Sequence, residues 1–337
     1  MEMKEKPKVL VLFKMKSRPL QKLKEHADVD IVLYPNEKDL KRIIGNYDAV
    51  VVSPLNRVSR EVVMAGKRLK VISCHSAGYD NVDVKAATER GVYVTKVSGW
   101  LSEAVAEFAV GLTIALLRKI AYTDAVVRRG EWRSHRDVWS RFKNIETLYG
   151  KRVGILGMGA IGKAIARRMR AMGTELFYWS RSRKPDIERE TGAKYLPVED
   201  VLRKSDVVVL ALPATEETYH VINAGNVELL RDKYLVNIGR GSLVDEAAVT
   251  EALKEGILKG YATDVFEDEP VREHELFKFP DRTVLTPHYA GLSLESMEDM
   301  GFKAVENLLK ILKGEYTDDI VNKEVMKLRP LEEVKML

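Results

Sequence analysis

The sequence is short of cysteine, of glutamine and of long apolar runs, and each shortage carries information. Cys74 is the one cysteine in 337 residues, which excludes an intramolecular disulfide and a multi-cysteine metal site and favours a reducing compartment. No apolar run reaches the roughly 18 residues that a membrane-spanning helix needs. The nearest run, residues 104–117, contains Glu107. Gln21 is the one glutamine although 31% of the residues are charged, a balance typical of thermophilic proteins.

A large excess of one charge is also missing. Lys and Arg number 55 against 50 Asp and Glu, and the net charge of +5 is not concentrated in a long basic run. A nucleic-acid-binding protein would gather that excess on one face, so we predict no nucleic-acid partner. Residues 1–19 place a short apolar run among charges and offer no small-residue cleavage site. This pattern predicts neither a signal peptide nor a membrane partner, and it favours a cytoplasmic protein.

What is present is an alternation of short apolar runs with charged helical patterns. The first stretch predicts strands at 9–13, 31–34, 49–52, 71–73 and 92–95, and helices at 20–26, 37–44, 60–65 and 83–90. The second predicts strands at 152–156, 175–179, 206–212, 234–238, 261–265 and 283–286, and helices that include 161–172 and 246–255. Such alternation predicts an α/β fold of two doubly wound parallel-sheet domains, whose ligand loops lie at the carboxyl ends of the strands.

A long apolar helix, Ser102–Ile120, is predicted between the two stretches. Ser102 is a suitable N-cap, and the residues after it are apolar nearly all round. A helix with that pattern must be buried, so we expect it to connect two domains and to pack against a second subunit. Residues 128–149, which include Trp139, predict a structured excursion, and a last helical pattern covers 294–313.

A glycine-rich loop is the strongest local motif. It follows the predicted strand at 152–156, precedes an apolar-periodic helix, and consists of Gly157, Met158, Gly159, Ala160, Ile161 and Gly162. In this context the first glycine permits a tight turn, the second lets the backbone approach a pyrophosphate, and the third lets helix and strand pack closely. The helix N-terminus adds amides and a favourable dipole. We therefore predict a dinucleotide-binding loop rather than a plain strand–turn–helix.

The end of the next predicted strand distinguishes two cofactors. An NAD site usually has Asp or Glu there, which accepts a hydrogen bond from the ribose 2′-hydroxyl. This chain instead has Ser180, Arg181, Arg183 and Lys184. A carboxylate would repel a 2′-phosphate, whereas a hydroxyl and cations can bind one. The loop therefore favours NADP(H) over NAD(H), and a loop whose charges simply face water is the alternative.

Three ionisable residues, Arg240, Glu269 and His288, follow successive late strands and are expected beside the dinucleotide. Each alone could be an ordinary loop charge, but three after a dinucleotide loop favour a catalytic set. Reduction of a ketone leaves an alkoxide that needs a proton, which His288 can donate as imidazolium. Glu269 would favour the charged ring and fix its orientation. Arg240 offers a planar fork for a carboxylate and the adjacent carbonyl oxygen, so the predicted substrate is a small 2-keto acid.

Together these motifs resemble the D-isomer-specific 2-hydroxyacid dehydrogenases over nearly the whole chain. The segments that carry the resemblance are Gly157–Gly162, residues 237–241 (Asn-Ile-Gly-Arg-Gly), 264–270 (Asp-Val-Phe-Glu-Asp-Glu-Pro) and 286–288 (Thr-Pro-His). The resemblance implies catalytic roles for Arg240, Glu269 and His288. The glutamate before Pro270 differs from the glutamine of the formate dehydrogenase branch. Within the family the chain is most similar to archaeal glyoxylate/hydroxypyruvate reductases.

The resemblance also implies which residues bind the cofactor and the substrate. Besides the glycine loop and Ser180, Arg181 and Arg183, the implied cofactor ligands are Pro213, Thr218, Ile238, Asp264 and His288, with Asp264 on the nicotinamide carboxamide. The implied substrate ligands are the backbone amides of Ala77 and Gly78 in the loop that starts at Ser76, together with Arg240, Leu55 and Trp139 of a neighbouring subunit. No metal is implied. Cys74-His75 and residues 96–99 depart from the family's common sequences, so the exact substrate stays open.

The resemblance implies an interleaved domain topology and a homodimer to which the helix 102–120 contributes. Residues 1–100 and 290–325 would form a flavodoxin-like substrate domain, and residues 101–289, including the helix 102–120, a Rossmann coenzyme domain. The predicted activity is NADPH-preferring reduction of glyoxylate or hydroxypyruvate. A broad-specificity D-2-hydroxyacid dehydrogenase and a short-type phosphoglycerate dehydrogenase are alternatives of the same class. A dinucleotide-sensing corepressor or scaffold is the alternative of another class.

Overall fold

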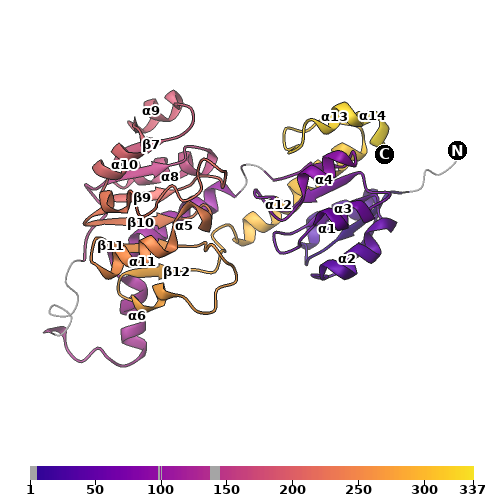
Figure 1. Cartoon of the computed structure of the whole chain (residues 1–337). Coiled ribbons are helices and arrows are strands. Elements are labelled where there is room, and N and C mark those ends of the chain that lie inside the picture. Colours follow the sequence, from indigo (N-terminus) through magenta and orange to yellow (C-terminus); the bar gives the residue numbers. More distant parts are fainter. Residues whose placement is uncertain (1–5, 98, 100, 137–144) are drawn as a thin grey trace. The chain divides into compact units, whose positions relative to one another are not determined.

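Two parallel sheets, each with its own core, organise the computed structural model of the chain (Figure 1). The structure describes residues 6–97, 99, 101–136 and 145–337. Unit 1 combines residues 1–101 with 293–337, and unit 2 is residues 102–292. The predicted fold class, two α/β domains with parallel sheets, is confirmed.

Unit 1 has a five-stranded parallel sheet in the order β2-β1-β3-β4-β5. Its strands are β1 (Lys8–Val11), β2 (Asp28–Ile31), β3 (Ala49–Val52), β4 (Val71–Cys74) and β5 (Tyr93–Thr95). This is the flavodoxin-like order, in which ligand loops lie outside the carboxyl ends of the strands near the point where the order reverses.

Alternate residues of these strands pack into two separate hydrophobic cores, because successive side chains of a strand point to opposite faces of the sheet. Val9 and Val51 pack on one face with apolar residues of α1 and α12, whereas Leu10 and Val50 pack on the other with residues of α2, α3 and α4. The helices are α1 (Ser17–His26), α2 (Glu37–Ile43), α3 (Arg60–Ala65), α4 (Val84–Glu89), α12 (Leu294–Leu312), α13 (Val325–Leu328) and α14 (Leu331–Val334). The last three belong to the C-terminal end of the chain, yellow to orange in Figure 1, and α12 packs against α1 and β4.

Unit 2 has a seven-stranded parallel sheet in the order β12-β11-β10-β9-β6-β7-β8. Its strands are β6 (Arg152–Leu156), β7 (Glu175–Trp179), β8 (Lys194–Tyr195), β9 (Val207–Leu210), β10 (Lys233–Asn237), β11 (Leu258–Thr263) and β12 (Thr283–Leu285). The order reverses between β6 and β9, which is the switch point of a Rossmann fold. The carboxyl ends of β6, β9 and β10 therefore surround the place where a dinucleotide binds in this class of sheet.

Helices cover the sheet of unit 2. They are α5 (Ser102–Leu117), α6 (Ile120–Arg128), α8 (Ala160–Ala171), α9 (Pro185–Thr191), α10 (Val198–Lys204) and α11 (Glu246–Lys254). Residues of α10 and α11 share a core with Leu156, Val208 and Leu235 of the sheet, and α5 packs against α8 and β11. Within the described residues, no helix combines the length and the apolar character that crossing a membrane would require.

The long helix predicted from Ser102 to Ile120 is in fact two helices. The first ends at Leu117, and Lys119 has a left-handed backbone (φ 52°) that interrupts the helix before α6 begins. Residues such as Val105 and Leu112 are buried, whereas Phe108 and Ile114 on the other side of the helix are half-buried in the single chain.

The second predicted strand was misplaced. β2 runs from Asp28 to Ile31 rather than over 31–34. It is an edge strand with mostly exposed side chains, so it has no apolar run to mark it in the sequence. The apolar run that suggested a strand continues past it, where Leu33 and Tyr34 are more than half exposed.

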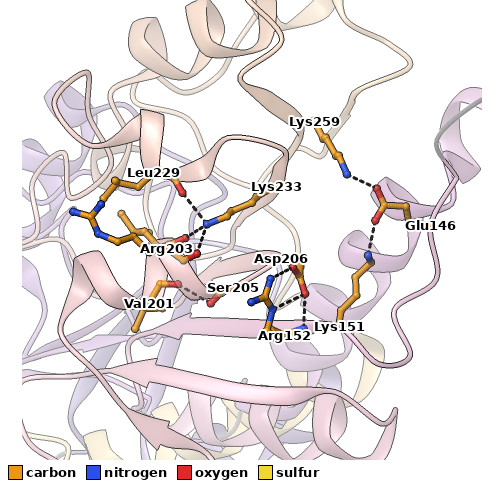
Figure 2. A network of polar contacts seen from close by, with 11 residues as sticks. Glu146, Lys151, Arg152, Val201, Arg203, Ser205, Asp206, Leu229, Lys233 and Lys259 are labelled. Carbon is orange, nitrogen blue, oxygen red and sulfur yellow. Dashed lines mark hydrogen bonds and ion pairs between the residues drawn. The ribbon is translucent and has the colours of Figure 1, made fainter.

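An ionic network joins the amino ends of the strands of unit 2 (Figure 2). Glu146 accepts hydrogen bonds from the ammonium of Lys151, from that of Lys259 (2.8 Å) and from the hydroxyl of Tyr234 (3.0 Å). Burial alone would raise the pKa of the Glu146 carboxyl, but these donors outweigh it and hold the pKa at about 2. In the same region Lys233 donates to three backbone carbonyls, those of Leu202, Arg203 and Leu229.

Candidate active site

The glycine loop has the shape that a dinucleotide requires. Gly157 has φ 104°, and a Cβ there would lie 2.5 Å from the carbonyl oxygen of Ala211. A Cβ on Gly162 would lie 1.9 Å from the carbonyl oxygen of Gly157, so the start of α8 can pack on the loop only without a side chain. A Cβ on Gly159, the N-cap of α8, would meet nothing within 4 Å. The loop therefore leaves open space at the helix N-terminus, where a pyrophosphate fits.

The loop after β7 carries Ser180, Arg181 and Arg183 as predicted, but two of them already have partners. The hydroxyl of Ser180 donates to the carbonyl of Ser182 (2.7 Å). The guanidinium of Arg183 binds the carboxylate of Glu188, with contacts between 2.8 and 3.1 Å. The side chain of Arg181 is exposed and has no hydrogen bond or ion pair among the described residues.

Three further predicted cofactor ligands, Pro213, Thr218 and Ile238, lie after β9 and β10. The hydroxyl of Thr218 is buried, donates to the carbonyl of Pro213 (2.7 Å) and accepts from the amide of Thr215 (2.8 Å). These bonds close the loop that follows β9. Ile238 directly follows β10, and its amide donates to the carbonyl of Leu210 (3.2 Å). Thr218 and Ile238 therefore stand in loops at the carboxyl edge of neighbouring strands.

Glu269 and His288 form a direct pair. Nδ1 of His288 lies 2.6 Å from Oε2 of Glu269, and the other carboxylate oxygen accepts the amide of Phe266 (2.9 Å). Burial alone would raise the pKa of the Glu269 carboxyl, but the contacts with His288 and Phe266 and the charge of Arg240 lower it. Glu269 is therefore held as a carboxylate facing one ring nitrogen, which leaves Nε2 of His288 for a reacting group.

The loop of Arg240 is tied to the loop of Glu269. The side-chain amide of Asn237 donates to the carbonyl of Arg240 (2.9 Å), and its oxygen accepts the amide of Gly239 (3.1 Å). A Cβ on Gly241 would lie 1.9 Å from the carbonyl carbon of Phe266. Because Gly241 has no side chain, the Arg240 loop can lie directly against the segment that leads to Glu269.

Asp264 anchors the segment that presents His288. Its buried carboxylate accepts hydrogen bonds from the hydroxyl of Thr286 (2.7 Å) and from the amides of Tyr289 (3.1 Å) and Ala290 (2.8 Å). The family resemblance implied that Asp264 contacts the nicotinamide. In the structure its carboxylate binds a side-chain hydroxyl before His288 and two backbone amides after it.

A second anchor lies at the start of α11. Glu246 accepts the amide of Glu267 (3.1 Å) and faces Nε2 of His274 (2.9 Å). Glu267 in turn pairs with His220 in the loop after β9. These contacts brace both sides of Glu269. Sequence reasoning missed Glu246, Thr286 and Asn237, although Thr286 and Asn237 lie inside the motifs that marked the site.

The predicted substrate-side residues of unit 1 come together after β3 and β4. The side chain of Asn81 donates to the carbonyls of Ser53 (3.1 Å) and Asn56 (2.7 Å), which fixes the turn that carries Leu55, itself 80% exposed. The hydroxyl of Ser76 donates to the carbonyl of Gly78 (2.6 Å). Within the described part of the chain, the amides of Ala77 and Gly78 donate to no acceptor, so they are available to an anion.

His75 fixes the start of this loop. The ring is buried, packs on Phe13 (4.6 Å between centroids) and faces the carbonyl of Met297 in α12 (3.3 Å). Burial lowers the pKa of His75 to about 4, so the ring is neutral at pH 7. The remaining candidate, Trp139, lies outside the described residues. No cluster of three potential metal ligands occurs within the described ranges.

Comparisons with known proteins identify the family of the chain. Residues 110–290 match the NAD-binding domain of the D-isomer specific 2-hydroxyacid dehydrogenases. Glyoxylate reductase of Pyrococcus horikoshii is 39% identical, with 96% of this chain and 98% of the relative covered. Glyoxylate reductase of Thermococcus kodakarensis is 40% identical with the same coverage.

The chain is also similar to solved structures. A crystal structure of a Pyrococcus horikoshii protein is 64% identical, with a TM-score of 0.84 and coverage of 98% of this chain and 100% of that one. An NADPH-dependent glyoxylate/hydroxypyruvate reductase from Sinorhizobium meliloti, in complex with NADP and malonate, is 30% identical, with a TM-score of 0.82 and coverage of 95% and 98%.

The chain has a Rossmann sheet, and its glycine loop leaves room for a pyrophosphate. Together with these relatives, this fold defines a nicotinamide-dinucleotide-dependent oxidoreductase. The chain belongs to the D-isomer-specific 2-hydroxyacid dehydrogenases.

Proposed function

We propose that this protein is an NADPH-preferring reductase that converts glyoxylate or hydroxypyruvate to the 2-hydroxy acid. The observation that carries the proposal is the pair of Glu269 and His288, in contact at 2.6 Å, with the loop of Arg240 packed against the same segment. Glyoxylate reductases that align over 96% of the chain support the substrate class. Malonate, a small dicarboxylate, is bound in the structure of the Sinorhizobium meliloti relative.

Proton transfer and substrate binding are assigned to different residues. His288, oriented by Glu269, gives its Nε2 proton to the oxygen that becomes the hydroxyl, and it takes that proton back in the oxidative direction. Arg240 binds the keto acid through its planar fork and polarises the carbonyl oxygen. On unit 1, the amides of Ala77 and Gly78 are proposed to bind the substrate carboxylate. The nicotinamide, when bound, supplies the hydride.

The preference for NADPH rests on the loop after β7. It has no carboxylate at the strand end to repel a 2′-phosphate, and Arg181 is exposed without an internal partner among the described residues. The relative from Sinorhizobium meliloti is itself named NADPH-dependent.

The test is a panel of 2-keto acids assayed with NADPH and with NADH. We expect glyoxylate and hydroxypyruvate to be reduced faster than pyruvate or 3-phosphohydroxypyruvate, with the higher kcat/KM for NADPH. A strong preference for NADH would overturn the proposed cofactor, and turnover of none of these acids would overturn the proposed reaction. His288→Asn should lower kcat by roughly 10²–10⁴-fold, the range for loss of a general acid.

We also propose that the chain acts as a homodimer. The outer side of α5 leaves Phe108, Val110 and Ile114 half-buried in the single chain. A second copy packed on this side would remove those apolar groups from water. Light scattering should therefore give about twice the mass of one chain, and Ile114→Glu should shift the protein to monomers; a monomeric wild type would refute the dimer.

A further inference from the structure

The loop that follows β7 is held by a carboxylate from the neighbouring helix. Nε and Nη2 of Arg183 both bind Glu188 of α9, at 2.8 and 2.9 Å, in a two-pronged ion pair. The Glu188 side chain is 15% exposed and that of Arg183 67% exposed. The carboxylate is thus the less exposed partner, and the guanidinium is the group that is drawn toward it.

Tyr178 prevents Glu188 from moving outward with Arg183. Tyr178 is fully buried in β7, and its hydroxyl donates to Oε1 of Glu188 (2.6 Å) while it accepts the amide of Lys184 (2.7 Å). Burial raises the pKa of Tyr178 to about 12, with a further contribution from Glu188, so the hydroxyl keeps its proton. The pKa of the Glu188 carboxyl is lowered, first by Arg183 and then by Tyr178, so it keeps its charge.

These contacts leave one cation of the loop without an internal partner. The hydroxyl of Ser180 donates to the carbonyl of Ser182, and the charge of Arg183 is neutralised by Glu188. The ammonium of Lys184 donates to the hydroxyl of Ser182 (2.7 Å). Arg181 has no hydrogen bond or ion pair among the described residues. The charge of Arg181 acts on the carboxylate of Glu217. The pKa of Glu217 is lowered chiefly by the hydroxyl of Thr215 and to a smaller extent by Arg181.

We propose that Glu188 is a positioning residue that sets the cofactor preference, by holding Arg183 away from the 2′-phosphate and leaving Arg181 as the cation that binds it. The inference rests on the proposed use of NADPH. It adds that Glu188 limits the preference for NADPH over NADH. Because one arginine rather than two meets the phosphate, the discrimination between NADPH and NADH is weaker than the basic loop suggests. Removing the charge of Glu188 frees Arg183, which lies two residues beyond Arg181 on the same loop.

The test measures binding of NADPH and NADH to the full chain by titration calorimetry, without substrate. Glu188→Gln keeps the size of the side chain and an oxygen for Tyr178, but it removes the charge that neutralises Arg183. We expect NADPH to bind about tenfold more tightly, as one added charge-assisted contact to phosphate would give, and NADH affinity to stay the same.

The double variant separates this effect from a change of loop structure. Glu188→Gln combined with Arg183→Ala should return the NADPH affinity to the wild-type value, and Arg183→Ala alone should leave it unchanged. Arg181→Ala should weaken NADPH binding about tenfold and leave NADH binding unchanged. The matched control is Glu190→Gln on the same helix, which breaks the pair with Arg167 (2.6 Å) and should alter neither cofactor.

Two outcomes overturn the role of Glu188. One is an equal change of NADPH and NADH affinity in Glu188→Gln. The other is a loss of NADPH affinity in Arg183→Ala alone, and this experiment can be done even if the Glu188 variant does not fold. A wild type that binds NADH more tightly, with no effect of Arg181→Ala, overturns the proposed NADPH preference instead. The two failures are therefore distinguishable.

Discussion

The carboxylate of Asp264 accepts a hydrogen bond of 2.7 Å from the hydroxyl of Thr286, two residues before His288. The same carboxylate also accepts the amides of Tyr289 and Ala290, directly after His288. His288 itself has φ 54°, a left-handed backbone that residues with a Cβ seldom adopt. Asp264 therefore restrains an unfavourable backbone that aims the imidazole.

Loss of the Thr286 hydroxyl should impair catalysis without removing any reacting group. Thr286→Val keeps the shape of the side chain but deletes one of the three donors to Asp264. One hydrogen bond contributes about 1 kcal/mol, so if that contribution is realised in the transition state we expect kcat to fall about threefold to tenfold. Steady-state kinetics should show the loss in kcat, with a nearly unchanged cofactor Kd.

A buried threonine far from the site provides the control for this variant. The hydroxyl of Thr174 donates to the carbonyl of Met169 at the end of α8 (2.8 Å). Thr174→Val should reduce stability to a similar degree but leave kcat at the wild-type value. Equal kcat values for both variants would show that Thr286 only stabilises the fold.

Glu269→Gln should slow reduction. The carboxylate of Glu269 faces Nδ1 of His288, and it stabilises a ring that gives up its Nε2 proton better than a neutral amide does. We expect kcat to fall about 10- to 100-fold, with a nearly unchanged cofactor Kd. Glu273→Gln, an exposed change in the same loop, should keep the wild-type kcat. A wild-type kcat in Glu269→Gln would contradict the proposed role.

Arg240→Lys should show that the planar fork matters and not only the charge. An ammonium cannot make the two parallel contacts of a guanidinium with a keto acid. We expect kcat/KM to fall about 10- to 100-fold, with most of the loss in KM for the keto acid and none in cofactor Kd. Arg231→Lys, at an exposed pair with Glu228, is the matched control and should leave kcat/KM unchanged. An unaltered KM in Arg240→Lys would remove Arg240 from substrate binding.

The parts of the site that the sequence predicted are those fixed by neighbours along the chain. The strand, glycine turn and helix of residues 152–171 are contiguous, so their spacing alone indicated the loop. The contact of Thr286 with Asp264 spans 22 residues and depends on the pairing of β11 with β12. Such a contact has no spacing rule, and Thr286 could be interpreted only as the end of a strand.

Charge pairing was the least predictable feature. Arg183 was expected to bind a phosphate because it lies in a basic loop, but the first turn of α9 brings Glu188 within 2.8 Å of it. Several acids follow Arg183 in the sequence, and only the buried hydroxyl of Tyr178 singles out Glu188. The break at Lys119 was missed for a related reason, because an apolar pattern does not reveal a left-handed residue.

Glu146 should make the stability of the protein depend on pH in the acid range. Its pKa is about 2 in the folded chain against an ordinary value of 4.5, because Lys151, Lys259 and Tyr234 donate to the carboxylate and outweigh its burial. When the pKa of a carboxyl is lower in the folded chain than in the unfolded chain, its charge stabilises the fold at any pH above the unfolded pKa. This contribution is lost as the pH falls from about 4.5 toward about 2.

Glu146→Gln should therefore lower the free energy of unfolding at pH 7 by about 1–2 kcal/mol, after allowing for solvent screening of a side chain that is 24% exposed. Below pH 4.5 the difference from wild type should narrow, because the wild-type carboxylate becomes protonated. Guanidinium unfolding followed by circular dichroism at pH 7, 5, 4 and 3 measures both effects. Glu199→Gln, which breaks an exposed pair with Arg203, should show no such trend, and a pH-independent difference for Glu146→Gln would mean that its charge does not stabilise the fold.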